Sequence, residues 1–210
     1  MSKPKGLLFD LHGVLQHFDN QGARSGEQAA GLPPGIIDRI AYQHPAYEAA
    51  KVGLMTDDEW ARIIEHVLVA EFGEKARSAI APWRDDRGRP DPVMIDLIEQ
   101  AGQVVEVGIL SNFTDRMHSD LALHGITARH AYASADLGIT KPSPFVFREA
   151  ADRMGIRPQD LFYFDDQVTF VAGARAAGLR AELFTTPQAC AHHLATLGIT
   201  VRLNTDAAQQ

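Results

Sequence analysis

The chain has 210 residues, of which 45% are hydrophobic, and its formal net charge is −7. This composition is ordinary for a globular protein, and the length suits one large domain or one domain that carries a smaller insertion. The acidic balance argues against nucleic acid and membrane surfaces as partners, because both bind clustered Lys and Arg. No apolar run approaches the roughly 18 residues of a membrane-spanning helix. Because the single cysteine, Cys190, cannot form an internal disulfide, we expect a cytoplasmic protein in a reducing compartment.

The first predicted element is a short buried strand over residues 5–10, which ends at Asp10. Gly13 follows shortly after it and can adopt a positive φ, so the chain can turn tightly beyond the strand. In open parallel α/β sheets, ligands gather beyond the carboxyl ends of the strands. Asp10 is therefore the first candidate for a functional carboxylate.

The next part of the chain predicts helices and no strand. Residues 16–31 are polar and Gly-rich, which predicts a connecting segment, and helical patterns follow over residues 33–81. Thr56 precedes three acidic residues and an apolar series at 3.6-residue spacing, which is typical of a helix start. Residues 82–92 are dense in Pro, Gly, Asp and Arg, so we predict a hinge or linker there.

The second half of the chain alternates between strand and helix. Predicted strands cover residues 104–110, 131–134, 161–164 and 180–184, and predicted helices between them cover 114–123, 145–154 and 171–177. This alternation predicts an α/β fold with a Rossmann-like, doubly wound parallel sheet and an α-helical insertion after the first strand. The predicted units are a core over residues 1–15 and 90–204, a helical insertion over 16–89, and a frayed tail over 205–210.

Three further polar clusters follow strand-like runs. Ser111 and Asn112 close one strand, although such residues are most often turn or helix-cap residues when considered alone. Asp165 and Asp166 close another, and adjacent carboxylates repel each other unless a cation such as Mg²⁺ lies between them. Lys141 stands before a Pro-Ser-Pro helix start, although a single Lys is usually a surface charge. Together with Asp10, these clusters combine a nucleophile, a phosphate-binding group, a cation and a metal cradle.

The order of these clusters resembles a known enzyme family. The four motifs are Phe9–Leu15, Ile109–Asn112, Gly138–Pro142, and Phe164–Asp166 with the glycine-containing run Ala172–Gly178 after it. They are similar to the motifs of haloacid-dehalogenase-superfamily hydrolases of subfamily I, which carry a helical cap between the first two motifs. The resemblance spans roughly residues 5–197. A response-regulator receiver domain also combines carboxylates, a Ser or Thr and a Lys, but it lacks the helical insertion.

The resemblance implies a Mg²⁺-dependent phosphatase that acts on a small phosphomonoester, as a monomer or homodimer. Asp10 would be the nucleophile that forms an aspartyl-phosphate, with His12 and Lys141 completing the catalytic set. The implied metal ligands are Asp10, the backbone carbonyl of His12, Asp165 and Asp166. The implied phosphate-binding groups are Ser111, Asn112 and Lys141. The helical insertion would be the cap that closes over the substrate and excludes water.

Two residues depart from the family's pattern. His12 occupies the position where phosphatases of the family usually have an Asp that acts as general acid and base. Phe170 occupies a position that commonly holds an Asp or Asn supporting the metal site. These departures motivate an alternative, in which a weakened or inactive relative binds a phosphorylated metabolite or a protein partner. A metal-independent 2-haloacid dehalogenase is a third reading, although such enzymes do not need the acid pair.

Overall fold

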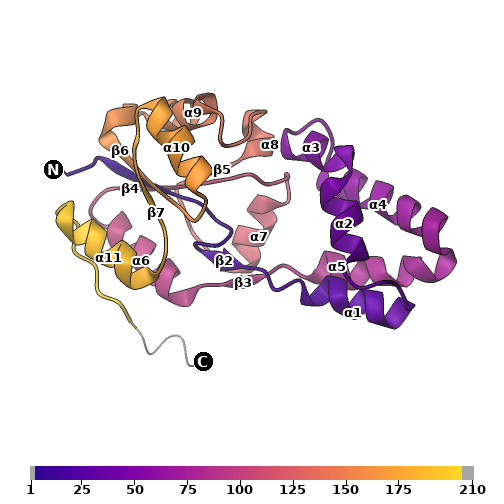
Figure 1. Cartoon of the computed structure of the whole chain (residues 1–210). Helices are drawn as coiled ribbons and strands as arrows, with labels where there is room; N and C mark the ends of the chain where they lie inside the picture. The colour runs from indigo at the N-terminus through magenta and orange to yellow at the C-terminus, as the bar shows by residue number, and fades with distance from the viewer. Residues whose placement is uncertain (1–2, 205–210) are drawn as a thin grey trace.

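The computed structural model describes residues 3–204 and contains a five-stranded parallel sheet with helices on both faces (Figure 1). The strands are β1 (Gly6–Phe9), β4 (Glu106–Ser111), β5 (His130–Ala133), β6 (Leu161–Asp165) and β7 (Arg180–Leu183), in the order β5-β4-β1-β6-β7. The predicted Rossmann-like α/β fold is confirmed. Register places Phe9 of the central strand opposite both Ile109 and Phe164, so β1, β4 and β6 end at the same edge.

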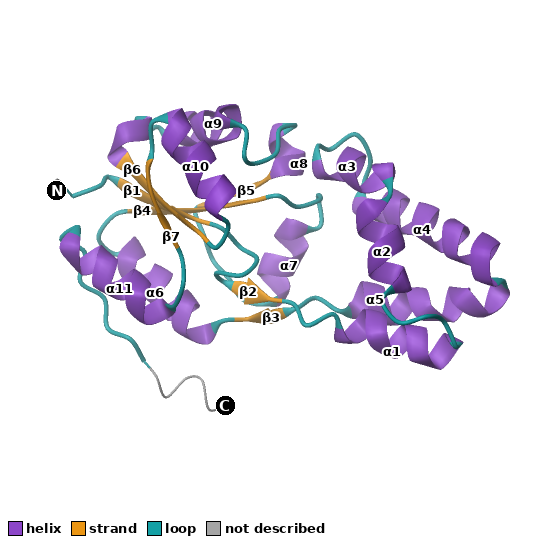
Figure 2. Cartoon of the chain, viewed as in Figure 1, coloured by secondary structure: helices purple, strands orange, loops and turns teal. Residues whose placement is uncertain are grey.

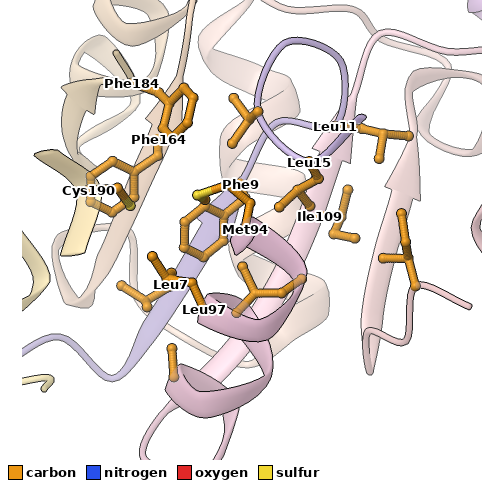
Figure 3. Packing of buried hydrophobic residues seen from close by; sticks show 14 of the residues in the cluster. Leu7, Phe9, Leu11, Leu15, Met94, Leu97, Ile109, Phe164, Phe184 and Cys190 are labelled. Carbon is orange, nitrogen blue, oxygen red and sulfur yellow. The ribbon is translucent and has the colours of Figure 1, made fainter. Parts of the chain in front are cut away.

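Helices cover the two faces of this sheet. One face packs on α6 (Pro92–Gly102), α7 (Met117–Leu123) and α11 (Pro187–Thr196), and the other on α8 (Ser134–Leu137), α9 (Pro144–Met154) and α10 (Val168–Ala177). Leu7 and Phe9 join the first apolar core, and Leu8 joins the second, as the two-residue period of a strand requires. Figure 3 shows Phe9 within the first core, beside Met94 of α6. Leu7, Leu8 and Phe9 are all fully buried, so β1 lies at the centre of the fold.

A helical unit stands beyond one end of the sheet (Figure 2). It contains α1 (Gln21–Ala30), α2 (Ile36–Gln43), α3 (Pro45–Lys51), α4 (Asp57–Phe72), the 3-10 helix η1 (Glu74–Ala79) and α5 (Ile80–Asp85). These helices share an apolar core of their own. The short antiparallel strands β2 (Gln16–His17) and β3 (Arg89–Pro90) pair where the chain enters and leaves the unit. The exact domain boundaries stay predictions.

The start of α4 is as the sequence predicts. The hydroxyl of Thr56 accepts a hydrogen bond from the backbone N–H of Glu59 at 3.2 Å, and the Glu59 carboxylate accepts one from the backbone N–H of Thr56 at 2.8 Å. This reciprocal capping satisfies two backbone donors that the helix itself leaves free. Trp60, Ile64 and Leu68 then follow on the buried face of the helix.

The prediction of a connecting segment over residues 16–31 was wrong, because α1 occupies most of it. Gly22 and Gly26, which suggested a loop, allow α1 to pack closely on α5 and η1. A Cβ atom at Gly22 would lie 2.2 Å from the carbonyl oxygen of Pro82, and one at Gly26 would lie 2.7 Å from that of Ala79. The glycines therefore permit helix contact instead of ending a helix.

The predicted linker over residues 82–92 was also wrong in part, because it contains the end of α5, the strand β3 and the start of α6. Asp91 caps α6 by accepting hydrogen bonds from the backbone N–H groups of Val93 and Met94, both at 3.0 Å. The sequence prediction included no helix there. The predicted frayed tail lies outside the described residues. Among the helices of residues 3–204, none combines the length and the apolar character needed to cross a membrane.

Candidate active site

Asp10 lies immediately after β1, at the edge where three strands end. Its backbone N–H donates to the carbonyl oxygen of Phe164 at 2.9 Å, which extends the pairing with β6 by one residue. One carboxylate oxygen, Oδ1, accepts a hydrogen bond from the backbone N–H of Leu11 at 2.7 Å. The residue is only 4% exposed. Backbone contacts therefore hold a buried carboxylate in a fixed orientation.

Lys141 connects the carboxylates of two strands. Its Nζ lies 2.8 Å from Oδ1 of Asp10 and 2.8 Å from Oδ2 of Asp165, and it donates to the hydroxyl of Tyr163 at 2.9 Å. The side chain of Asn112 holds the backbone of Lys141 from both sides: its amide donates to the Lys141 carbonyl at 2.9 Å, and its oxygen accepts from the Lys141 N–H at 2.7 Å. Because Lys141 is 3% exposed, its ammonium is a buried charge that pairs with buried partners.

Three carboxylates converge beside this lysine. Asp10, Asp165 and Asp166 each offer an oxygen, and the three oxygens lie within 4.8 Å of one another. Burial and the neighbouring Asp10 raise the pKa of Asp165, while Lys141 opposes this rise. Burial and the charge of Asp165 raise the pKa of Asp166. The cluster therefore has an excess of negative charge that one lysine does not offset.

The donor set of this cluster fits Mg²⁺, which prefers carboxylate and carbonyl oxygens. The loop after β1 is shaped around the cluster, because Gly13 has a φ of +84° and a Cβ atom there would lie 2.3 Å from Oδ2 of Asp166. Backbone can thus approach the carboxylate where a side chain could not. Asp10, Asp165, Asp166 and the backbone of this loop are the groups that could hold a cation.

His12 lies in apolar surroundings. Its ring centroid is 4.8 Å from that of Phe18 and 4.6 Å from that of Phe113. Its buried Nε2 has no hydrogen-bond partner among residues 3–204. Burial, assisted by the charge of Lys141, lowers the pKa of His12 to about 3. The imidazole is therefore neutral near pH 7, and its role as acid and base stays a prediction.

Phe170 contacts the site through its ring. The Nζ of Lys141 lies 4.7 Å from the centroid of this ring, which is within the range of cation–π attraction. An apolar side chain thus covers the lysine at the position where the family commonly has a polar one. Ser111 is 2% exposed and lines the same cavity as Asp10 and Lys141.

The comparison with protein families agrees with this geometry. The model of the haloacid dehalogenase-like hydrolase family matches residues 4–178, which is most of the chain. The chain belongs to the haloacid dehalogenase-like hydrolases.

Individual relatives cover most of the chain. A phosphatase of Mycobacterium tuberculosis is 29% identical over 84% of this chain and 85% of its own length. Among solved structures, a family enzyme of Bacteroides thetaiotaomicron in complex with magnesium and inorganic phosphate has a TM-score of 0.70 at 21% identity, covering 87% of this chain and 94% of that one. An L-2-haloacid dehalogenase has a TM-score of 0.66 at 24% identity, covering 87% of this chain and 85% of that one. These structures support the fold.

The cavity of this hydrolase extends from Asp10 to the helical unit and has a volume of about 600 Å³. Its lining includes both tryptophans of the chain and two of its four tyrosines. Sequence reasoning assigned no site role to the tyrosines, and it also missed Tyr163, whose hydroxyl donates to Oδ2 of Asp165. Tyr163 and Asp165 are two residues apart on one strand and so share a face, which was the available signal.

An ion-pair network joins the hydrolase's helical unit to its sheet domain. The buried carboxylate of Asp57 pairs with Arg84, lies 3.7 Å from Arg116, and accepts a hydrogen bond from the hydroxyl of Thr114 at 2.8 Å. Arg116 also lies 3.6 Å from Asp120. Sequence reasoning did not find this network, because its members come from three separate segments of the chain. It fixes α4 and α5 against the loop that follows β4.

Proposed function

We propose that this hydrolase is a Mg²⁺-dependent phosphatase that cleaves a small phosphomonoester through an aspartyl-phosphate on Asp10. One observation carries the proposal: Lys141 lies 2.8 Å from both Asp10 and Asp165, and Asp166 completes a group of three carboxylates around the same point. A nucleophile, a positive charge and a metal cradle therefore meet in one buried place. Phosphoryl transfer needs these parts, because it depends on positioning and on stabilising negative charge.

The contacts of Asp10 indicate which of its oxygens attacks. Both Lys141 and the backbone N–H of Leu11 approach Oδ1, so Oδ2 is the oxygen left for phosphorus. A bond forms between Oδ2 and phosphorus while the bond from phosphorus to the alcohol oxygen breaks, and that oxygen takes a proton from solvent water. Water then attacks the same phosphorus, which releases phosphate and restores the Asp10 carboxylate.

The remaining site residues bind and orient the reacting group. Asp10, Asp165, Asp166 and the backbone carbonyl of His12 would hold Mg²⁺, which offsets charge between nucleophile and phosphate when bound. Ser111, the backbone N–H of Asn112 and Lys141 would bind the phosphoryl oxygens. Asn112 also positions Lys141 through the two hydrogen bonds between them.

The helical unit is the proposed cap. Its residues and those of the sheet domain line one cavity, and the hydroxyl of Ser134 in α8 donates to the carbonyl of Lys51 in α3 at 2.6 Å. Figure 1 shows α3 beside α8 across this boundary. A cap in this place would exclude water from the aspartyl-phosphate until the alcohol has left.

The test is phosphate release from a panel of phosphomonoesters, measured with and without Mg²⁺. We expect turnover that requires Mg²⁺ and that Asp10→Asn abolishes while the circular dichroism spectrum is retained. Asp152→Asn is the matched control, because Asp152 is exposed on α9 and does not line the cavity. Turnover that persists in Asp10→Asn would contradict the mechanism.

A second candidate is binding without turnover. His12 favours it, because a ring packed on Phe18 and Phe113 replaces the usual acid, and so does the apolar Phe170 beside Lys141. It predicts that inorganic phosphate and Mg²⁺ raise the melting temperature although no ester is cleaved. Any Mg²⁺-dependent rate that requires Asp10 would rule it out. Metal-independent dehalogenation would instead require halide release from 2-haloacids without Mg²⁺, and the retained Asp166 argues against it.

A further inference from the structure

The part of the cavity that the helical unit lines is aromatic. The ring centroid of Trp60 lies 5.8 Å from that of Tyr42, 4.9 Å from that of Tyr47 and 5.3 Å from that of Trp83. All four side chains line the cavity that contains Asp10. We refer to these four residues as the aromatic wall.

The rings of the aromatic wall present apolar surface. The indole N–H of Trp60 donates to the carbonyl oxygen of Ala41 at 3.2 Å, so this polar group is satisfied inside the helical unit. Trp60 and Trp83 are 5% and 7% exposed, whereas Tyr42 is 45% exposed. The wall therefore combines two buried rings with the half-buried Tyr47 and the exposed Tyr42, and it can accept an aromatic group by stacking or edge contact.

Several polar groups near the wall already have partners. Asp57 pairs with Arg84 and accepts from Thr114. The amide of Asn20 donates to Asp38 at 2.7 Å, and Asp86 accepts from the backbone N–H of Gly22 at 2.9 Å. A sugar would need several free hydrogen-bonding groups here, and a second anion would need an unpaired cation. Neither is offered by these residues.

We propose that the substrate is the phosphate monoester of a flat, apolar alcohol whose ring lies against the aromatic wall. This inference rests on the proposed phosphatase function. The catalytic carboxylates and the wall line one cavity of about 600 Å³, a size typical of sites for drug-sized ligands, roughly 300–1,000 Å³. Such a cavity is much larger than an ester of two or three carbons requires. Sugar phosphates and esters with a second anionic group are the poorer substrates.

The test compares primary-alcohol esters, so that the leaving groups are chemically alike and differences report recognition. The substrates are benzyl phosphate, glycerol 3-phosphate, glucose 6-phosphate and phosphoglycolate. We expect KM for benzyl phosphate to be at least about tenfold lower than for the other three, as aromatic contact plus area burial allows. Equal or better kcat/KM for a sugar phosphate or for phosphoglycolate, with Mg²⁺ and Asp10 required, would overturn this inference and leave the phosphatase function standing.

Tyr42→Ala tests the wall directly, because Tyr42 is exposed enough for the fold to tolerate its loss. We expect this variant to raise KM for benzyl phosphate about five- to tenfold and to change KM for glycerol 3-phosphate by a much smaller factor. Phe145→Ala is the control, because Phe145 is 65% exposed and lies outside the cavity. An unchanged preference for benzyl phosphate in Tyr42→Ala would contradict the role of the wall.

A binding measurement separates this inference from catalysis. Titration calorimetry of the Mg²⁺-loaded wild type compares benzylphosphonate with methylphosphonate, neither of which has the scissile ester bond. We expect about tenfold tighter binding of benzylphosphonate, and Tyr42→Ala should remove most of that difference. Equal affinities would overturn the inference even if no ester in the panel were cleaved.

Discussion

The two ends of the cavity are built in different ways. The sheet end is charged, and its side chains follow three parallel strands whose register places Asp10, Ser111 and Asp165 at one edge. The helical end is aromatic and gathers residues from α2, α3, α4 and α5. At the sheet end, the backbone of the strands positions the charged side chains. At the helical end, packing between helices determines the shape of the cavity. Changes at the sheet end should therefore abolish the reaction, whereas changes at the helical end should redirect or loosen it.

The largest effect is expected from Lys141→Met. This change removes the buried cation between Asp10 and Asp165, and removing one partner of a buried pair typically costs about 3–5 kcal/mol. We expect a loss of at least about 10³-fold in kcat and a clear fall in melting temperature, measured by phosphate release and calorimetry. Lys5→Met is the control, because the Lys5 side chain is 70% exposed and its ion pair is 3.8 Å long. A kcat within tenfold of wild type would show that Lys141 is structural only.

A smaller loss of activity is expected from Asp166→Asn, which removes one of the three carboxylates that would bind Mg²⁺ and leaves the other two. In the wild type, Mg²⁺ at a concentration 100 times its dissociation constant should raise the free energy of unfolding by about 2.7 kcal/mol. The variant should need much more Mg²⁺ both for this stabilisation and for turnover, because a neutral amide replaces a carboxylate of the cluster. The melting temperature, measured across a Mg²⁺ titration, gives the Mg²⁺ concentration that each protein needs for this stabilisation. An unchanged Mg²⁺ dependence would place the metal elsewhere.

At the boundary between the two ends, Asp57→Asn should change preference more than rate. The amide can keep the hydrogen bond from Thr114 but no longer neutralises Arg84 and Arg116. We expect kcat/KM for phosphoglycolate to rise about tenfold relative to benzyl phosphate, because Arg84 and Arg116 each lose one carboxylate partner and then attract a second anion more strongly. Asp152→Asn is the comparison, since Asp152 is exposed on α9 and does not line the cavity. A constant ratio would mean that these arginines do not face the substrate.

The smallest functional effect should come from Gly22→Ala, which perturbs packing inside the helical unit. The new Cβ atom would meet the Pro82 carbonyl at 2.2 Å, and overpacking of this kind typically costs about 1–3 kcal/mol. We expect a lower melting temperature with Asp10-dependent turnover retained. Gly102→Ala in α6 is the matched change, because its nearest neighbour would be 3.9 Å away and alanine favours helix. Equal stability of the two variants would contradict the close approach of α1 and α5.

The sheet end was largely predictable because its residues stand in sequence directly after the strands that position them. A carboxylate after a buried strand, a Ser-Asn pair, an acid pair and a Lys before Pro-Ser-Pro were all visible as local patterns. The parallel alternation of strands and helices then brought them to one edge. Tyr163 was missed because a tyrosine within an apolar strand has the pattern of a core residue.

The helical end could not be predicted in the same way. The glycines of α1 suggested a loop, and only their closeness to Pro82 and Ala79 shows why a helix needs them. The partners of Asp57 lie 27 residues or more away along the chain, so no local spacing predicts the network.

By itself, the sequence determined the α/β alternation, the helical segment after the first strand and the residues of the charged rim, because each depends on short-range periodicity and strand ends. Only the tertiary structure decided that Lys141 bridges two carboxylates, that His12 lies between Phe18 and Phe113, and that four rings form one wall. The physical reason is that burial and side-chain contact depend on how separate helices pack, and packing joins residues that no local pattern connects.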